Sequence, residues 1–119
     1  MSPRVRALLI VTALVLGIGW AEQALRGWNN DRLGVQVAAV ARPGDIRMLS
    51  TQTCVYCRQA RGWFSAHRVP FDECFIEQDA ACAQEFSARL APGTPLLLVR
   101  GKTLIGFEPG AVLAALGSE

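Results

Sequence analysis

An unbroken apolar run occupies residues 7–21 of the 119-residue chain, directly after Arg4 and Arg6. A basic flank followed by an apolar stretch is typical of a secretion or insertion signal. The run has no polar face to turn toward water, so we exclude it from the folded domain. It is shorter than the roughly 20 residues that span a bilayer, and it ends in Gly19-Trp20-Ala21, a pattern that a signal peptidase could cut. The sequence therefore predicts a signal anchor or a cleaved signal peptide at residues 1–21.

Positive charge before an apolar segment favours leaving that end of the chain in the cytoplasm. We therefore expect the rest of the chain on the extracytoplasmic, periplasmic side, anchored in the membrane if the segment is retained and secreted if it is cut. Trp20 and Trp28 would lie at the outer interface of a retained anchor. Residues 22–44 contain several Gly, Asn and Pro residues and one short apolar stretch. We interpret them as a tether to a domain at residues 45–119, and the tether could begin as a helix that continues the anchor.

The charge of the chain is divided unevenly between these parts. Residues 1–44 contain five Arg and two acidic residues, and residues 45–119 contain six Arg, one Lys and eight acidic residues, so +3 and −1 give the net +2. The excess positive charge thus belongs to the N-terminal segment. No basic stripe with interleaved aromatic residues is present, and we therefore predict no nucleic-acid partner.

The domain alternates between strand and helix patterns. Apolar runs predict strands at residues 46–49, 69–76, 96–99 and 103–107, and helical spacing predicts helices at 54–67, 79–90 and 110–116. Asp79 can cap the second of these helices, whose apolar stripe is Cys82, Phe86 and Leu90. Arg100-Gly101-Lys102 is a tight hairpin turn between the last two strands. The order β-α-β-α-β-β-α predicts an α/β fold with a four-stranded mixed sheet flanked by helices.

Cys54-Val55-Tyr56-Cys57 lies where the first strand passes into the first helix of the domain. A spacing of three on a helix brings two side chains within reach of a disulfide. Cys54 falls at the helix N-terminus, where free N–H groups and the macrodipole favour a thiolate. Cys57 lies one turn further on and is more shielded. We therefore expect Cys54 to attack a substrate disulfide and Cys57 to resolve the mixed disulfide.

Two other uses of this cysteine pair stay open. It could be a purely structural disulfide, or it could supply soft ligands to copper or zinc. The second use is disfavoured, because the chain has no second CxxC and its single histidine, His67, is predicted at the far end of the helix. A redox-inert domain that only scaffolds a membrane complex is a further alternative, which the intact dithiol disfavours.

Residues 46–116 resemble the glutaredoxins and their thioredoxin-fold relatives. The resemblance rests on Ser50-Thr51 before Cys54-Val55-Tyr56-Cys57, on Val69-Pro70-Phe71, on Gly93-Thr94-Pro95 and on Gly106-Phe107-Glu108-Pro109, all in one collinear register. It implies a thioredoxin-like fold, thiol–disulfide oxidoreductase activity and a cis peptide bond at Pro95. It also implies that Tyr56, Thr94, Pro95, Gly106 and Phe107 contact the substrate, with the backbone of Thr94 free to pair with an extended chain.

The chain departs from the glutaredoxins that use glutathione. Those proteins usually have a basic residue just before the CxxC and a Gly-Gly-x-Asp near the end, whereas Gln52 and Thr53 are neutral here and Gly106 is followed by Phe107. We therefore predict no bound cofactor and an electron partner, membrane-bound or soluble, that is a protein rather than glutathione. The direction of electron flow is left open. Arg68 also replaces the usual glycine after the first helix, which predicts mild strain there or an altered helix end.

Cys74 and Cys82 form a second pair. Alternation along the second strand places Cys74 on the face that the following helix would cover, so Cys82 could lie above it. A structural disulfide is the favoured interpretation, because an exported domain gains stability from such a cross-link. Two buried free thiols, or a second redox pair that relays electrons to the dithiol, are the alternatives.

Overall fold

The computed structural model describes residues 1–117, which divide into two compact units, Met1–Asp31 and Arg32 onward. Helix α1 (Pro3–Val40) makes up nearly all of the first unit and continues into the second. By its length and composition α1 could cross a membrane. Its apolar side chains between Val5 and Leu25 are exposed.

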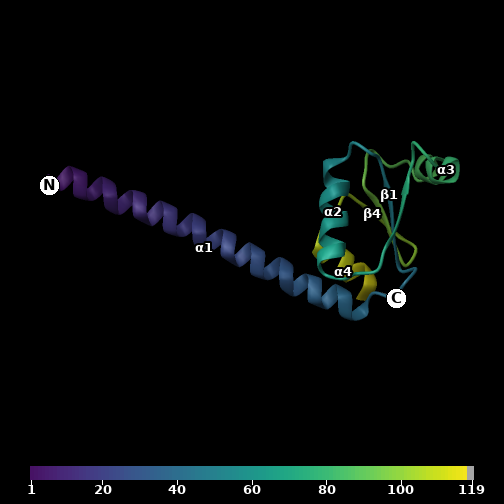
Figure 1. The fold of residues 1–119 in the computed structure, drawn as a ribbon, viewed down its shortest axis with the longest axis horizontal. Coiled ribbons are helices and arrows are strands. Elements are labelled where there is room, and N and C mark those ends of the chain that lie inside the picture. Colours follow the sequence, from purple (N-terminus) through teal and green to yellow (C-terminus); the bar gives the residue numbers. More distant parts are fainter. Residues whose placement is uncertain (118–119) are drawn as a thin grey trace. The chain divides into compact units, whose positions relative to one another are not determined.

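The second unit is built on a four-stranded mixed sheet of order β2-β1-β3-β4 (Figure 1). The strands are β1 (Ile46–Ser50), β2 (Asp72–Phe75), β3 (Leu96–Val99) and β4 (Lys102–Ile105). β1 pairs in parallel with β2, while β3 is antiparallel to both β1 and β4. Three helices complete the unit, α2 (Val55–Ala66), α3 (Ala80–Ala88) and α4 (Pro109–Gly117). The predicted fold class and element order are confirmed.

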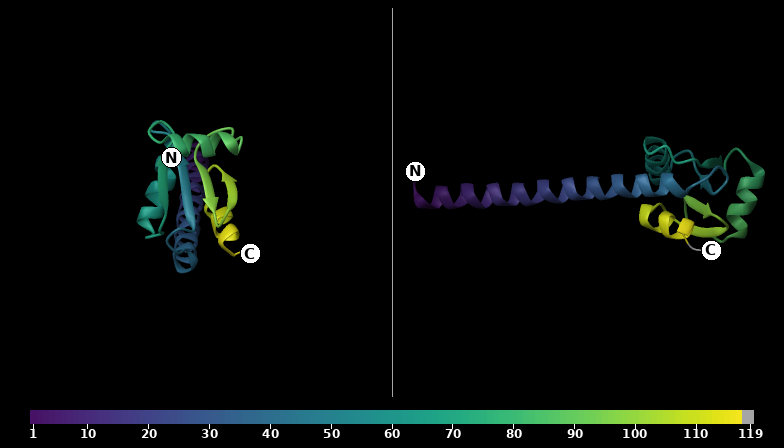
Figure 2. Two further views of the ribbon diagram at one scale, coloured as in Figure 1. Left: turned by 90° about the vertical axis from the view of Figure 1, so that its right-hand side faces the viewer. Right: turned by 90° about the horizontal axis from the view of Figure 1, so that it is seen from below.

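The helices cover the two faces of the sheet unequally (Figures 1 and 2). The larger apolar core lies on the face that α2 and α4 cover, and its strand residues are Ile46, Met48, Leu97 and Val99. The alternate residues Leu49, Leu96 and Leu98 point to the other face, where they meet Cys82 of α3. The period of two along each strand thus divides one short sheet between two cores.

Residues 22–44 were expected to form a tether, but most of them are helical and the last of them pack on the domain. Helix α1 runs on to Val40, and Val37 is fully buried in the larger core with Ala38 and Ala41 packed against it. A Cβ at Gly34 would overlap the imidazole of His67 at the end of α2. The reason is that no proline interrupts residues 22–42, so the helix continues until its small apolar residues find the domain surface.

Several helix ends follow the predicted rules. The side chain of Asp79 caps α3 by accepting hydrogen bonds from the N–H groups of Ala81 and Cys82. Arg68 has a left-handed φ of 56° at the end of α2, so the helix keeps the end that glycine would favour, and a residue with a side chain adopts this strained conformation. Leu90 was expected on the buried stripe of α3, which is wrong. Because α3 ends at Ala88 and the chain turns left-handed at Leu90, with a φ of 53°, this side chain is 88% exposed.

Arg100 joins the end of α1 to the hairpin and to α4. Its guanidinium donates hydrogen bonds to the carbonyl oxygens of Val40 and Leu116 and to the carboxylate of Asp45. The hydrogen bonds from Arg100 and from the N–H of Arg42 lower the pKa of Asp45 below its usual value. One guanidinium thereby gives hydrogen bonds to carbonyl groups at the C-terminal ends of α1 and α4 that have no partner within their own helix.

Candidate redox site

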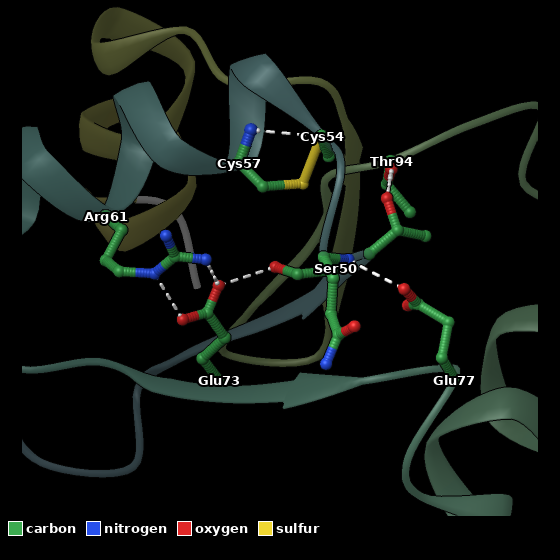
Figure 3. Close-up of a disulfide and its surroundings, with 9 residues drawn as sticks. Ser50, Cys54, Cys57, Arg61, Glu73, Glu77 and Thr94 are labelled. Atoms are coloured by element: carbon green, nitrogen blue, oxygen red, sulfur yellow. Dashed lines mark hydrogen bonds and ion pairs between the residues drawn. A yellow bond between two sulfur atoms is a disulfide. The ribbon is translucent and has the colours of Figure 1, made fainter.

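The predicted dithiol is at the N-terminus of α2. Cys54 is the N-cap residue in an extended conformation, and its Sγ accepts a hydrogen bond of 3.0 Å from the N–H of Cys57 (Figure 3). The two cysteines are joined as a disulfide with Cα atoms 5.2 Å apart. Cys54 is partly exposed, whereas Cys57 is fully buried.

This geometry separates the chemistry of the two thiols. In the reduced protein a thiolate at Cys54 would receive the Cys57 N–H and the positive end of the helix dipole, both of which stabilise negative charge. Cys57 is out of reach of a large substrate but within reach of Cys54. The site can therefore attack a disulfide with one sulfur and close an internal disulfide with the other.

The Thr94-Pro95 loop lies beside the loop that leads into the dithiol. The Thr94–Pro95 peptide bond is cis, as the resemblance implied. The hydroxyls of Thr94 and Thr51 are 3.2 Å apart and hydrogen bonded, and the N–H of Gly106 donates to the carbonyl oxygen of Pro95. These bonds bring three of the predicted segments together, residues 51–57, 94–95 and 106.

Two other predicted substrate contacts have different surroundings. Tyr56 is 66% exposed on the first turn of α2 and is free to meet a partner. Phe107 packs into the larger core instead, with its ring centroid 5.5 Å from that of Trp63 and 5.3 Å from that of Phe64. Its packing role was not predicted, and contact with a substrate stays a prediction for both residues.

Sequence reasoning missed a charged network beneath the dithiol (Figure 3). Arg61 of α2 makes two hydrogen bonds of 2.7 Å to the carboxylate of Glu73 on β2, and the buried Ser50 donates a third, also of 2.7 Å. Burial by itself raises the pKa of Glu73, but the bonds from Arg61 and Ser50 outweigh it, so the pKa is lowered. The available signal was alternation, because Glu73 shares a strand face with Phe71 and Phe75.

A second carboxylate was missed as well. Glu77, in the turn after β2, accepts a hydrogen bond of 2.8 Å from the backbone N–H of Gln52. Gln52 belongs to the loop that ends at Cys54, and Figure 3 shows Glu77 reaching toward that loop from the side opposite to Glu73. No periodic pattern in the sequence marks such a contact.

Cys74 and Cys82 are joined as a disulfide between β2 and α3, with Cα atoms 6.1 Å apart. Cys82 is buried in the smaller core and Cys74 packs against it. This pair therefore lies on the face covered by α3, whereas Cys57 belongs to the helix on the other face. Within residues 1–117 no cluster of three or more His, Cys, Asp or Glu side chains could hold a metal ion, so the metal-binding alternative has no support.

The fold and the dithiol define a thioredoxin-fold redoxin. Comparison with known proteins shows which family of redoxins the domain resembles. Residues 46–104 match the glutaredoxin family model. The domain therefore belongs to the glutaredoxin family, whose members are generally thiol–disulfide oxidoreductases. No curated protein sequence matches the chain.

Solved structures show the same fold at low sequence identity. A variant of the thioredoxin-like protein BC3987 aligns over 64% of this chain and 99% of its own, with 19% identity and a TM-score of 0.56. Methanoredoxin from Methanosarcina acetivorans aligns over 68% of this chain and 93% of its own, with 19% identity and a TM-score of 0.53. Glutaredoxin from Methanosarcina mazei Go1 aligns over 63% and 80%, with 20% identity and a TM-score of 0.52.

Proposed function

We propose that this protein is an extracytoplasmic thiol–disulfide oxidoreductase that exchanges electrons with protein disulfides. The observation that carries the proposal is the unequal dithiol, with Cys54 partly exposed at the N-cap of α2 and Cys57 fully buried behind it. The apolar part of α1 with Arg4 and Arg6 before it supports export, and a retained α1 would anchor the domain.

In the reducing direction, the Cys54 thiolate attacks one sulfur of a substrate disulfide. The substrate S–S bond breaks, a Cys54–substrate disulfide forms, and the other substrate sulfur leaves as a thiolate that takes up a proton. Cys57 then loses its proton and attacks Sγ of Cys54, which releases the second substrate thiol. Two electrons have passed from the dithiol to the substrate, and the reverse sequence would oxidise a substrate dithiol.

A protein partner is favoured over glutathione by the charges at the dithiol. The residues before Cys54 are neutral, and the N–H of Gln52 is occupied by the carboxylate of Glu77. A negative group at this place opposes an anionic tripeptide. The exposed Val55 and Tyr56 instead give the rim of the site an apolar and aromatic surface, which suits a polypeptide.

The test is reduction of a model protein disulfide, insulin, by the purified domain with dithiothreitol as electron source. Cys54→Ser should abolish the activity. Cys57→Ser, reduced first and mixed with insulin after dithiothreitol has been removed, should accumulate a mixed disulfide with insulin through Cys54. The second variant is the matched control, because it removes one thiol from the same motif but keeps the attacking one. Undiminished activity in Cys54→Ser would contradict the proposal.

A further inference from the structure

Glu77 places a negative charge on the loop that leads into the attacking cysteine. Its carboxylate is 2.8 Å from the N–H of Gln52, which precedes Cys54 by two residues. Since consecutive Cα atoms are about 3.8 Å apart, the Cα atoms of Gln52 and Cys54 are separated by at most about 7.6 Å. Removing the carboxylate would leave the loop before the dithiol without this restraint.

The turn that carries Glu77 is itself held at both ends. The Cys74–Cys82 disulfide closes a short loop around it, with a sequence separation of 8. Within that loop the N–H of Ile76 donates to the carbonyl of Ser50, and the side chain of Asp79 caps α3. Glu77 therefore contacts the dithiol loop from a turn that the disulfide and these hydrogen bonds hold in place.

We propose that Glu77 is a positioning residue of the redox site, and that the Cys74–Cys82 disulfide acts on the dithiol through it as a clamp. A carboxylate on the loop just before Cys54 disfavours the thiolate, and therefore the reduced form of the dithiol. Glu77 thus opposes the stabilisation that the start of α2 gives to the same thiolate. The clamp deepens the proposed function, because it assigns the second disulfide a part in setting the reactivity of the first.

The first test measures the alkylation rate of Cys54 at pH 7 by iodoacetamide. The Cys57→Ser chain is used, in which Cys54 is the only free thiol while Cys74 and Cys82 stay linked. Glu77→Gln keeps an oxygen acceptor for Gln52 but removes the charge. The rate should rise because the thiolate is no longer opposed by this negative charge. Coulomb's law gives at most about a threefold change for unit charges about 7 Å or more apart in water.

Asp72→Asn is the matched control. Asp72 is exposed at the start of β2, opposite Arg47, whereas Glu77 follows the other end of that strand. The control should leave the alkylation rate unchanged. Equal rates in the Glu77→Gln and Asp72→Asn chains would overturn the proposal.

The second readout is the reduction potential of Cys54–Cys57 in the chain with all four cysteines. Glu77→Gln should make it less negative, because the reduced form gains stability, and Asp72→Asn should not change it. If the carboxylate only stabilised the fold, Glu77→Gln would lower the melting temperature and leave the reduction potential unchanged.

The clamp is tested by a double-mutant cycle in the Cys57→Ser background. Replacing Cys74 and Cys82 by Ser should raise the alkylation rate toward that of Glu77→Gln, and it should add nothing once Glu77 is already Gln. Additive effects, or no effect of the cross-link, would contradict the clamp. Replacing both cysteines by Ala is the second variant, because it removes the cross-link without burying hydroxyl groups in the smaller core.

These results are separable from the proposed function. A chain that does not reduce insulin, yet responds to Glu77→Gln in the alkylation assay, would overturn the proposed activity and support Glu77 as a positioning residue. A chain that reduces insulin, but whose alkylation rate does not respond to Glu77→Gln, would support the proposed activity and overturn the role of Glu77.

Discussion

Two carboxylates hold the segment that leads from β1 into the dithiol. Glu73 accepts a hydrogen bond from Ser50, the last residue of β1, and Glu77 accepts one from the N–H of Gln52. The charge of Glu73 is paired with Arg61 in a nearly buried setting, since its side chain is only 12% exposed. We therefore assign Glu73 to the stability of the site and Glu77 to the reactivity of the site.

Glu73 should make the folded domain sensitive to acid. Because its pKa in the folded state is lowered below the ordinary value of 4.5, it contributes stability that is complete above about pH 4.5 and is lost as the pH falls through the folded pKa. Glu73→Gln should cost about 1–2 kcal/mol at pH 7, since Arg61 loses its charged partner. The melting temperature should also fall less between pH 7 and pH 3 in this variant than in the unmodified chain.

Melting curves in the same buffers check this prediction, with Asp72→Asn as the control. Asp72 lies on the same strand but is exposed, so its replacement should leave the acid sensitivity in place. A Glu73→Gln chain that loses as much stability in acid as the unmodified chain would show that other carboxylates cause the loss.

At the residue scale, the sequence predicts chemistry that depends on local position. The environments of Cys54 and Cys57 follow from their places on the first turn of one helix, and the cap at Asp79 follows from its place before another. The Glu73 and Glu77 contacts join β2 and its turn to α2 and the dithiol loop. Such partners depend on how the sheet assembles, which local patterns do not specify.

At the scale of elements, two glycines inside helices should respond oppositely to alanine. Gly62 of α2 has open space around its Cα, so Gly62→Ala should raise the free energy of unfolding by up to about 1 kcal/mol through helix propensity. Gly34 of α1 lies against His67, and Gly34→Ala should lower the free energy of unfolding by about 1–3 kcal/mol through overpacking.

Urea unfolding of the two variants decides between propensity and packing. The pair serves as its own control, because both changes add the same methyl group to a helix. If Gly34→Ala were also stabilising, residues 32–40 would not pack on the domain as closely as the contact with His67 requires.

The elements were predicted with unequal success for a physical reason. Strands, helices and the hairpin were found because each has its own periodicity or turn residues, and Arg100 and Gly101 do adopt the left-handed turn. The end of α1 was missed because its helical pattern is carried by small residues such as Ala38 and Ala41, which resemble a linker. They become part of the protein interior only where they pack against the larger core of the folded domain.

At the scale of the whole molecule, the two disulfides divide between the two faces of one sheet. Cys57 is buried on the side of the larger core and Cys82 in the smaller core. The larger core also includes Val37 of α1. This residue lies before residue 45, where the sequence pattern placed the start of the domain. A chain that starts at residue 45 would lose that contribution, and the folded unit is better taken from Arg32.

Export of the domain can be tested on the complete chain with alkaline phosphatase fused to its C-terminus, because this enzyme folds into an active form only where disulfides persist. Colonies expressing the fusion in a bacterial host should have phosphatase activity. Replacing both Arg4 and Arg6 by Glu should reduce it severalfold, because the N-terminal positive charge that holds this end in the cytoplasm is lost.

Arg26→Glu is the matched control, since it removes a positive charge from the other side of the apolar run and should not reduce the activity. Fractionation then separates the two fates of α1, with the fusion in the membrane pellet if α1 is an anchor and in the soluble periplasmic fraction if it is cut. An intact but inactive fusion would place the dithiol in the cytoplasm. There, the reducing glutathione pool would keep an accessible dithiol such as Cys54–Cys57 largely reduced, and export would have to be abandoned.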